Sequence, residues 1–155
     1  MSAVEGAVST AMRSTATSTE EYKAIVRTWV ETAWNQGDLT SAAILYAANY
    51  IYQDPTSTVY GPEGIKQLVA LYRSALPDLH FVIKDLIAEG DSVVWRYVAT
   101  GTQHGPLPGI PATGKRVEVT GVVISRFQDG KWAEDWHVQD TLGMLQQLGV
   151  IPLLA

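Results

Sequence analysis

The sequence predicts an α+β fold in which a curved antiparallel sheet carries helices on one side. Apolar residues recur at helical spacing in the first half of the chain, and strand alternation dominates from Leu79 onward. Short glycine-containing turns separate the later segments, as in an antiparallel meander. Helices followed by a meander indicate α+β architecture. No repeat or domain boundary is visible, so residues 18–155 are expected to form a single domain.

The composition bounds the class of protein. The chain has 155 residues, 46% hydrophobic and 17% charged, which is enough for one domain with a core. The net charge of −5 argues against nucleic acid or an acidic membrane surface as a partner, because both need a basic face. No apolar run is long enough to span a bilayer. The absence of cysteine excludes disulfides, thiolate nucleophiles and zinc–sulfur sites, and it is compatible with the cytoplasm, where we expect the protein.

The first helix is expected to follow a flexible tail. Residues 1–17 are rich in Ala, Ser, Thr and Gly, and they lack the basic start and apolar core of a secretory signal. Ser18-x-x-Glu21 matches a capping box, which predicts a helix that begins at Ser18 and ends at Gly37. Its apolar stripe consists of Tyr22, Ile25, Val26, Trp29, Val30, Ala33 and Trp34.

Two more helices and one strand are predicted before the meander. A short helix runs from Leu39 to about Tyr46, and a strand runs from Tyr50 to the proline at position 55. The third helix opens at Gly61 with a proline in its first turn and stops at Pro77. Its buried stripe consists of Ile65, Leu68, Val69, Tyr72 and Leu76.

Four strands and a final helix complete the predicted fold. Gly90-Asp91 is suited to a tight hairpin, and the proline- and glycine-rich segment 105–114 is predicted as an irregular loop. The predicted strands cover residues 79–89, 92–103, 116–127 and 131–139, and the final helix covers residues 141–148.

The last strand carries the most unusual chemistry in the chain. Alternation places Asp135 and His137 on one face, about 7 Å apart at the backbone, and Trp132, Trp136 and Val138 on the other. Two interpretations are open. Either the apolar face packs on the core and the polar pair faces water, or the polar pair lines a pocket and contacts one small molecule.

The turn before this strand sets what lies opposite His137. A three-residue loop with Gly130 left-handed puts His137 opposite Gly121, whereas a two-residue turn puts it opposite Val122. A glycine in mid-strand often marks a place of close approach. Gly121 is therefore a candidate for leaving space for a ligand in front of His137.

The residue types present favour general acid–base catalysis. His80, His104 and His137 lack the spacing of metal ligands, and no GxSxG nucleophile elbow occurs. The 105–114 loop does not open a helix, as a phosphate-binding loop would. Histidine exchanges protons near neutral pH, and a neighbouring carboxylate is expected to raise its pKa. Asp135 and His137 are therefore the candidate catalytic residues, and no metal or cofactor is predicted.

Further candidates come from residues that suit an aromatic pocket. Asp54 either reaches the pocket or forms an Asp-Pro turn, and His104 is either an exposed loop residue or a pocket residue. Tryptophans and tyrosines are most often core residues, but they also line aromatic cavities well. Trp29, Tyr52 and Tyr97 are the candidate substrate contacts among them.

Several phrases, in the same order, resemble the SnoaL-like polyketide cyclases over nearly all of the chain after the tail. They are WNQGDL (34–39), the Asp-Pro end of the first strand, GPEGIKQL (61–68), GTQHGPLPGIPATGKRVEV (101–119) and DGKWAEDWHVQDTLGMLQQLG (129–149). The resemblance implies the conical fold of nuclear transport factor 2 and ketosteroid isomerase. In that fold, helices lie on the concave side of the sheet and a pocket lies between them.

Two departures from the family bear on the site. The family's acid–base aspartate follows a histidine in the phrase His-Trp-Asp, whereas here the matching residues are Asp135-Trp136-His137, in exchanged order. At the loop entrance, relatives often have Gly-Thr-His-x-Gly, whereas this chain has Gln103 followed by His104. Gln103 and His104 complete the set of candidate substrate-binding residues.

Three functions are compatible with this resemblance. The first is a cofactor-independent acid–base enzyme of antibiotic biosynthesis that acts on an aromatic polyketide. One of Asp135 and His137 would then remove a C–H proton while the other protonates the carbonyl oxygen. The second is a hydroxylation or other tailoring component for an anthracycline-type polycycle, working with a partner reductase. The third is a small-molecule-binding module without catalysis.

A homodimer is also expected. Trp132, Trp136 and Val138 would form an apolar strip on the outer face of the sheet if they do not face the pocket, and such strips usually mark interfaces.

Overall fold

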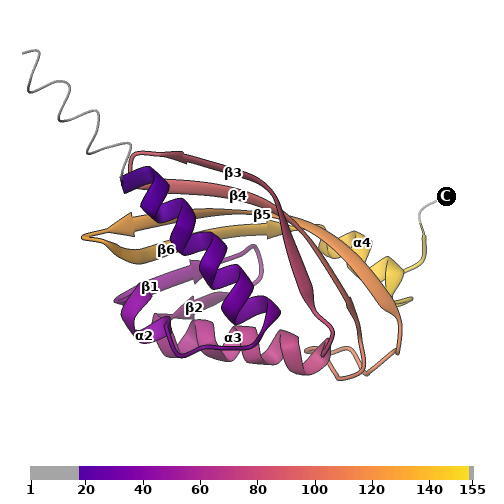
Figure 1. The fold of residues 1–155 in the computed structure, drawn as a ribbon. Coiled ribbons are helices and arrows are strands. Elements are labelled where there is room, and N and C mark those ends of the chain that lie inside the picture. The colour runs from indigo at the N-terminus through magenta and orange to yellow at the C-terminus, as the bar shows by residue number, and fades with distance from the viewer. Residues whose placement is uncertain (1–17, 154–155) are drawn as a thin grey trace, which may run out of the picture.

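A strongly curved sheet forms the frame of the molecule (Figure 1). The computed structural model describes residues 18–153; the predicted tail at 1–17 lies outside the described residues, as do 154–155. The six strands follow the order β2-β1-β6-β5-β4-β3. They are β1 (Tyr46–Gln53), β2 (Thr58–Tyr60), β3 (His80–Glu89), β4 (Ser92–Thr102), β5 (Arg116–Gln128) and β6 (Lys131–Gln139).

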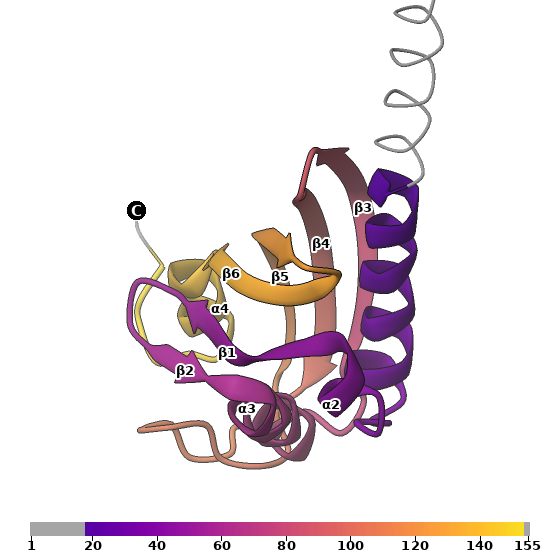
Figure 2. The same ribbon diagram turned by 90° about the vertical axis from the view of Figure 1, so that its left-hand side faces the viewer.

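Helices cover the concave side of this sheet (Figure 2). The first helix spans residues 18–35 and packs beside β3, and α3 (Gly61–Ala75) packs against β1 and β2. The short α2 (Ala42–Leu45) precedes β1, and α4 (Thr141–Gln147) lies against β5. The predicted α+β class with a curved sheet is confirmed. None of the helices described is long and apolar enough to cross a membrane.

One strand pair differs from the antiparallel pattern that the sequence predicted. β1 runs parallel to β6, whereas all other neighbouring strands are antiparallel. A parallel pair needs a long crossover connection, and α3 with the β3–β5 meander supplies it. The three-residue β2 (Thr58–Tyr60) was not predicted, because it is too short to show an alternation.

The first helix widens before it ends. Residues 18–29 are α-helical, and η1 (Val30–Asn35) continues as a π-helix, a conformation often found near functional sites. Residues five apart in an α-helix point roughly 140° away from each other. The wider π turn reduces that angle, so Trp29 and Trp34 both line the same cavity. Gly37, with φ +78°, ends the helix as predicted.

The turn before β6 has two residues, but neither predicted register is correct. Asp129 and Gly130 both have positive φ, as a two-residue hairpin turn requires. A bulge at Ala133 then shifts the rest of β6, because Phe127 pairs with Trp132 while the preceding residue of β5 pairs with Glu134. As a result His137 lies opposite Val123, not opposite Gly121 or Val122.

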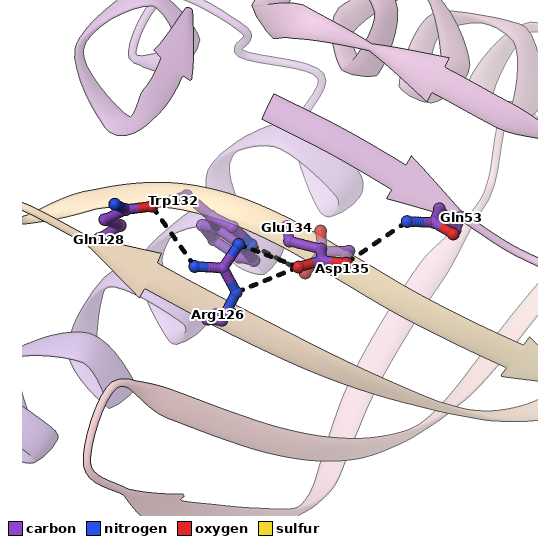
Figure 3. Close-up of polar contacts among 6 residues, drawn as sticks. All are labelled: Gln53, Arg126, Gln128, Trp132, Glu134 and Asp135. Atoms are coloured by element: carbon purple, nitrogen blue, oxygen red, sulfur yellow. Dashed lines mark hydrogen bonds and ion pairs between the residues drawn. The ribbon is translucent and has the colours of Figure 1, made fainter. Parts of the chain in front are cut away.

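The bulge also changes which face of the sheet Trp132 occupies. The sequence predicted Trp132 beside Trp136 on the outer face. The structure places it on the concave face, where it is buried and its indole donates a hydrogen bond to Asp135 (Figure 3). Glu134 stays outside, where it accepts hydrogen bonds from Arg126 and Gln53. One extra residue in β6 thus adds an indole to the concave face.

Candidate functional site

A largely apolar cavity of about 70 Å³ lies between the concave face of the sheet and the helices. Its polar side chains come chiefly from the inward-facing positions of β6, namely Asp135, His137 and Gln139. Thr100 of β4 adds a hydroxyl, and Met144 of α4 adds to the apolar lining. Its aromatic walls are formed by Trp29, Trp34, Tyr46, Tyr52, Tyr72, Phe81, Trp95, Tyr97 and Trp132.

Asp135 lies at the wall of this cavity in a ring of hydrogen-bond donors. Oδ1 accepts from the Ser125 hydroxyl at 2.5 Å and from the Trp132 indole at 2.8 Å. Oδ2 accepts from the Tyr50 hydroxyl at 2.6 Å. Ser125 lies directly opposite Asp135 across the strands and accepts from the indole of Trp95 in turn. The carboxylate is therefore held in one orientation with a single lone pair of Oδ2 unoccupied.

His137 lies between two tyrosine hydroxyls. Its Nδ1 is 2.5 Å from the Tyr52 hydroxyl, and its Nε2 is 2.6 Å from the Tyr97 hydroxyl. Tyr52 belongs to β1 and Tyr97 to β4, so strands on both sides of β6 fix the imidazole. Both ring nitrogens are thus engaged with protein groups, and each hydroxyl can act as donor or acceptor.

Gly121 explains how Tyr97 reaches the imidazole. The two residues are directly paired between β4 and β5. A Cβ atom at position 121 would overlap both the hydroxyl and the ring of Tyr97. The sequence predicted that Gly121 leaves space for a ligand, but Tyr97 fills that space, and the missing side chain lets its ring lie across the strand.

The two candidate catalytic groups have pKa values shifted in opposite directions. Burial raises the pKa of Asp135 to about 6, although the hydrogen bonds from Ser125, Tyr50 and Trp132 oppose the shift. Burial lowers the pKa of His137 to about 4, and the Asp54 carboxylate opposes that shift only in part. The expectation that Asp135 would raise the pKa of His137 is wrong, because desolvation of the imidazolium dominates. Near pH 7 the site therefore holds a carboxylate and a neutral imidazole.

Sequence comparison assigns the chain to a family. The model of the SnoaL-like polyketide cyclases matches residues 24–148. The chain belongs to this family. No curated protein sequence matches it significantly.

Solved structures of similar fold include proteins from three Streptomyces species. TsrD from Streptomyces laurentii is 34% identical over 83% of this chain and 97% of its own, with a TM-score of 0.74. AclR from Streptomyces galilaeus, named as a candidate hydroxylase, is 28% identical over 87% and 85% of the two chains, with a TM-score of 0.74. IdmH from Streptomyces antibioticus, named as a candidate polyketide cyclase, is 28% identical over 82% and 98%, with a TM-score of 0.69.

The two polar groups of the Asp135-Trp136-His137 segment lie in different environments. Asp135 occupies the donor ring, where a charge is stabilised by hydrogen bonds. His137 occupies the position between the tyrosines, where burial keeps it neutral. Among the described residues, no cluster of His, Cys, Asp and Glu has the arrangement of a metal site.

The other predicted substrate contacts fall into three groups. Trp29, Tyr52 and Tyr97 line the cavity. Asp54 and Gly121 lie behind it, next to Tyr52 and Tyr97. Gln103 and His104 belong to the loop entrance, away from the cavity lining.

Gln103 anchors the 105–114 loop. Its buried amide donates to the carbonyls of Ile110 and Pro111 and accepts from the backbone and hydroxyl of Thr113. His104 is exposed, and its backbone N–H donates to the carbonyl of Ala75 at the end of α3. These contacts fix the loop against α3.

Ser125 and Trp132 are site residues that the sequence analysis missed. A signal existed for Ser125, because it is the polar member of an inward-facing series with Val119, Val123 and Phe127. Trp132 could not be assigned to the cavity, because only the bulge at Ala133 brings it to the inner face.

Proposed function

We propose that the protein is a cofactor-independent acid–base enzyme that acts on an aromatic polyketide in antibiotic biosynthesis. The observation that carries this proposal is the pairing of a buried carboxylate and a neutral imidazole, Asp135 and His137, in one aromatic cavity. Groups with opposed pKa shifts at one site are characteristic of acid–base catalysis. Membership of the SnoaL-like family supports an aromatic polyketide as the substrate class.

In a ring closure by aldol condensation, ionised Asp135 is the base. Its free Oδ2 lone pair accepts the proton of a carbon that lies between two carbonyl groups of the substrate. That carbon then forms the new C–C bond with a second carbonyl carbon, whose oxygen becomes an alkoxide. The alkoxide takes a proton from the hydrogen-bonded groups around His137, and Asp135 releases its proton to water as the product leaves, so that in sum one C–H bond is broken and one O–H bond is formed.

The size of the cavity restricts how a substrate is bound. A volume of about 70 Å³ is well below the 300–1,000 Å³ or so of a typical drug-sized ligand site. The cavity accommodates the reacting carbonyl end of a substrate, and the remaining rings extend through the opening or displace aromatic side chains.

A second candidate function is a hydroxylation component that works with a partner reductase on an anthracycline-type polycycle. The similarity to AclR, named as a candidate hydroxylase, supports it. Incubation of the purified protein with a ring-open aromatic polyketide, with and without a reductase and nicotinamide cofactor, separates the two functions. We expect a cyclised product in both mixtures. A product that carries added oxygen and forms only with the reductase would support the second function, and binding without turnover in either mixture would overturn both.

A further inference from the structure

A continuous chain of hydrogen bonds leads from the turn after β1 into the cavity. The Tyr52 hydroxyl lies 3.1 Å from Oδ2 of Asp54 and 2.5 Å from Nδ1 of His137. On the other side of the ring, Nε2 lies 2.6 Å from the Tyr97 hydroxyl. Asp54 is partly exposed in the turn, whereas Tyr97 is buried and lines the cavity. The chain thus connects a carboxylate near solvent with a hydroxyl at the site.

We propose that Asp54, Tyr52, His137 and Tyr97 form a proton relay between solvent and the substrate, in which Tyr97 is the catalytic residue that touches the substrate oxygen. This inference rests on the proposed acid–base function and names the groups that deliver its proton.

The contacts of His137 explain why the imidazole does not act alone. Both of its ring nitrogens are occupied by tyrosine hydroxyls, so a substrate oxygen cannot bond to the ring unless it displaces one of them. The Tyr97 hydroxyl also lies 3.4 Å from Oε1 of Gln139, which lines the cavity. That amide oxygen marks the direction in which Tyr97 donates a proton, and a substrate carbonyl or alkoxide oxygen would take its place.

The relay has two complete arrangements. A tyrosine hydroxyl carries one proton and accepts at its oxygen, and a neutral imidazole donates from one nitrogen and accepts at the other. In the inward arrangement, a protonated Asp54 donates to Tyr52, Tyr52 donates to Nδ1, Nε2–H donates to Tyr97, and Tyr97 donates into the cavity. In the outward arrangement, Tyr97 donates to Nε2, Nδ1–H donates to Tyr52, and Tyr52 donates to Asp54.

Delivery of one proton converts the inward arrangement into the outward one. Tyr97 gives its proton to the substrate alkoxide and takes the Nε2 proton, and Nδ1 takes the proton of Tyr52. The Tyr52 oxygen takes a proton that enters from water through Asp54. One proton enters the chain and one leaves it. Each ring and hydroxyl ends neutral, which suits an imidazole whose pKa burial has lowered.

The variant Asp54→Asn tests the two arrangements without any substrate. Oδ1 of Asp54 accepts from the Thr56 and Ser57 backbone, and an asparagine oxygen keeps these bonds. Its amide N–H then faces Tyr52, which must donate to Nδ1. We expect ¹⁵N NMR of His137 near neutral pH to show mainly the Nδ1–H tautomer in the wild type, where Tyr52 donates to the Asp54 carboxylate, and only the Nε2–H tautomer in the variant. Ring signals that are identical in both proteins would overturn the relay.

A second variant, Tyr52→Phe, interrupts the chain and leaves the turn intact. Exchange of the His137 ring proton with water should slow by about tenfold or more, because it then depends on local opening of the fold. Tyr60→Phe is the matched control, since Tyr60 is an exposed tyrosine of β2, and it should exchange like the wild type. Equal rates in all three proteins would overturn the relay while leaving the acid–base function open. Conversely, a relay that passes both tests in a protein that turns over no polyketide would refute the proposed function alone.

Discussion

Tyr97 reaches His137 by lying across Gly121. The Tyr97 hydroxyl is 2.6 Å from Nε2 of His137, and the space it occupies exists only because position 121 has no side chain. Gly121 lies in the middle of β5, where a glycine normally weakens a strand. Its presence there is explained by the position of the Tyr97 ring.

The substitution Gly121→Ala should therefore displace Tyr97 from His137. Overpacking of this kind costs about 1–3 kcal/mol of stability, and we expect turnover to fall with it. Urea denaturation and turnover assays on the same samples measure both effects. In a Tyr97→Phe background, where the hydroxyl is already absent, Gly121→Ala should cause little further loss of activity, because residues in contact are non-additive. Independent, multiplicative losses would show that Gly121 does not act through Tyr97.

The pKa shifts of Asp135 and His137 predict opposite effects of pH on stability. The pKa of Asp135 is raised from 3.8 to about 6, so its contribution to the free energy of unfolding is present below pH 3.8 and lost as pH rises through 6. The pKa of His137 is lowered from 6.5 to about 4, so its contribution is present above pH 6.5 and lost as pH falls through 4. Between pH 4 and 6 the Asp135 contribution falls as the His137 contribution rises, so in the wild type the two changes with pH largely cancel.

Single substitutions should separate these contributions. Between pH 4 and 6, the free energy of unfolding of Asp135→Asn should rise relative to that of the wild type, because the variant keeps the His137 contribution and lacks the Asp135 contribution. The stability of His137→Gln should fall over the same range. Urea denaturation at closely spaced pH values measures both differences, and other titrating groups cancel in the comparison. Difference curves of the same sign would contradict the assigned shifts.

Most of the fold could be predicted from the sequence because its signals are local. The range predicted for the last strand agrees with the structure, and Gly37 and Gly90-Asp91 end elements as predicted. No local signal marks the bulge at Ala133, because the segment WAEDWHV suits a regular strand and a bulged strand equally well. The register and the inner position of Trp132 follow from that bulge, so the sequence alone could not supply them.

The site was predictable in part for the same reason. The shared face of Asp135 and His137 follows from strand alternation alone, and both line the cavity. The partners of these two residues come from other strands, so they depend on register and sheet order. Tyr52 reaches His137 because β1 lies parallel to β6, which the predicted antiparallel sheet did not include.

Self-association through the outer sheet face is the next prediction. Trp136 and Val138 are more than half exposed and lie opposite Ile124 and Val122, which are also exposed. Such an apolar strip is uncommon on monomers, and a second copy of the chain presents an identical strip to cover it. We expect a dimer mass in sedimentation at micromolar protein and a monomer for Trp136→Glu. Ile44→Glu, an exposed apolar position on α2, is the control and should remain dimeric. A wild type that sediments as a monomer would exclude this interface.

The last prediction concerns the catalytic pair itself. His137→Ala and Asp135→Asn should each lower turnover of the polyketide by about 10²–10⁴-fold, as removal of a general acid or base typically does. The fold should persist in Asp135→Asn, because the amide oxygen can accept from Ser125 and Trp132 while Tyr50 accepts from the amide N–H. Circular dichroism and turnover assays measure the two effects, and the double variant should lose far less than the product of the single losses. In the wild type, turnover should fall as pH drops through about 6, where Asp135 becomes protonated.

Exchange of the pair, Asp135→His with His137→Asp, puts a carboxylate between Tyr52 and Tyr97 and an imidazole in the donor ring. We expect that variant to lose native turnover, because an ionised carboxylate between the two tyrosines accepts from both hydroxyls and holds no proton to deliver. Full activity in His137→Ala would exclude His137 from the acid–base chemistry.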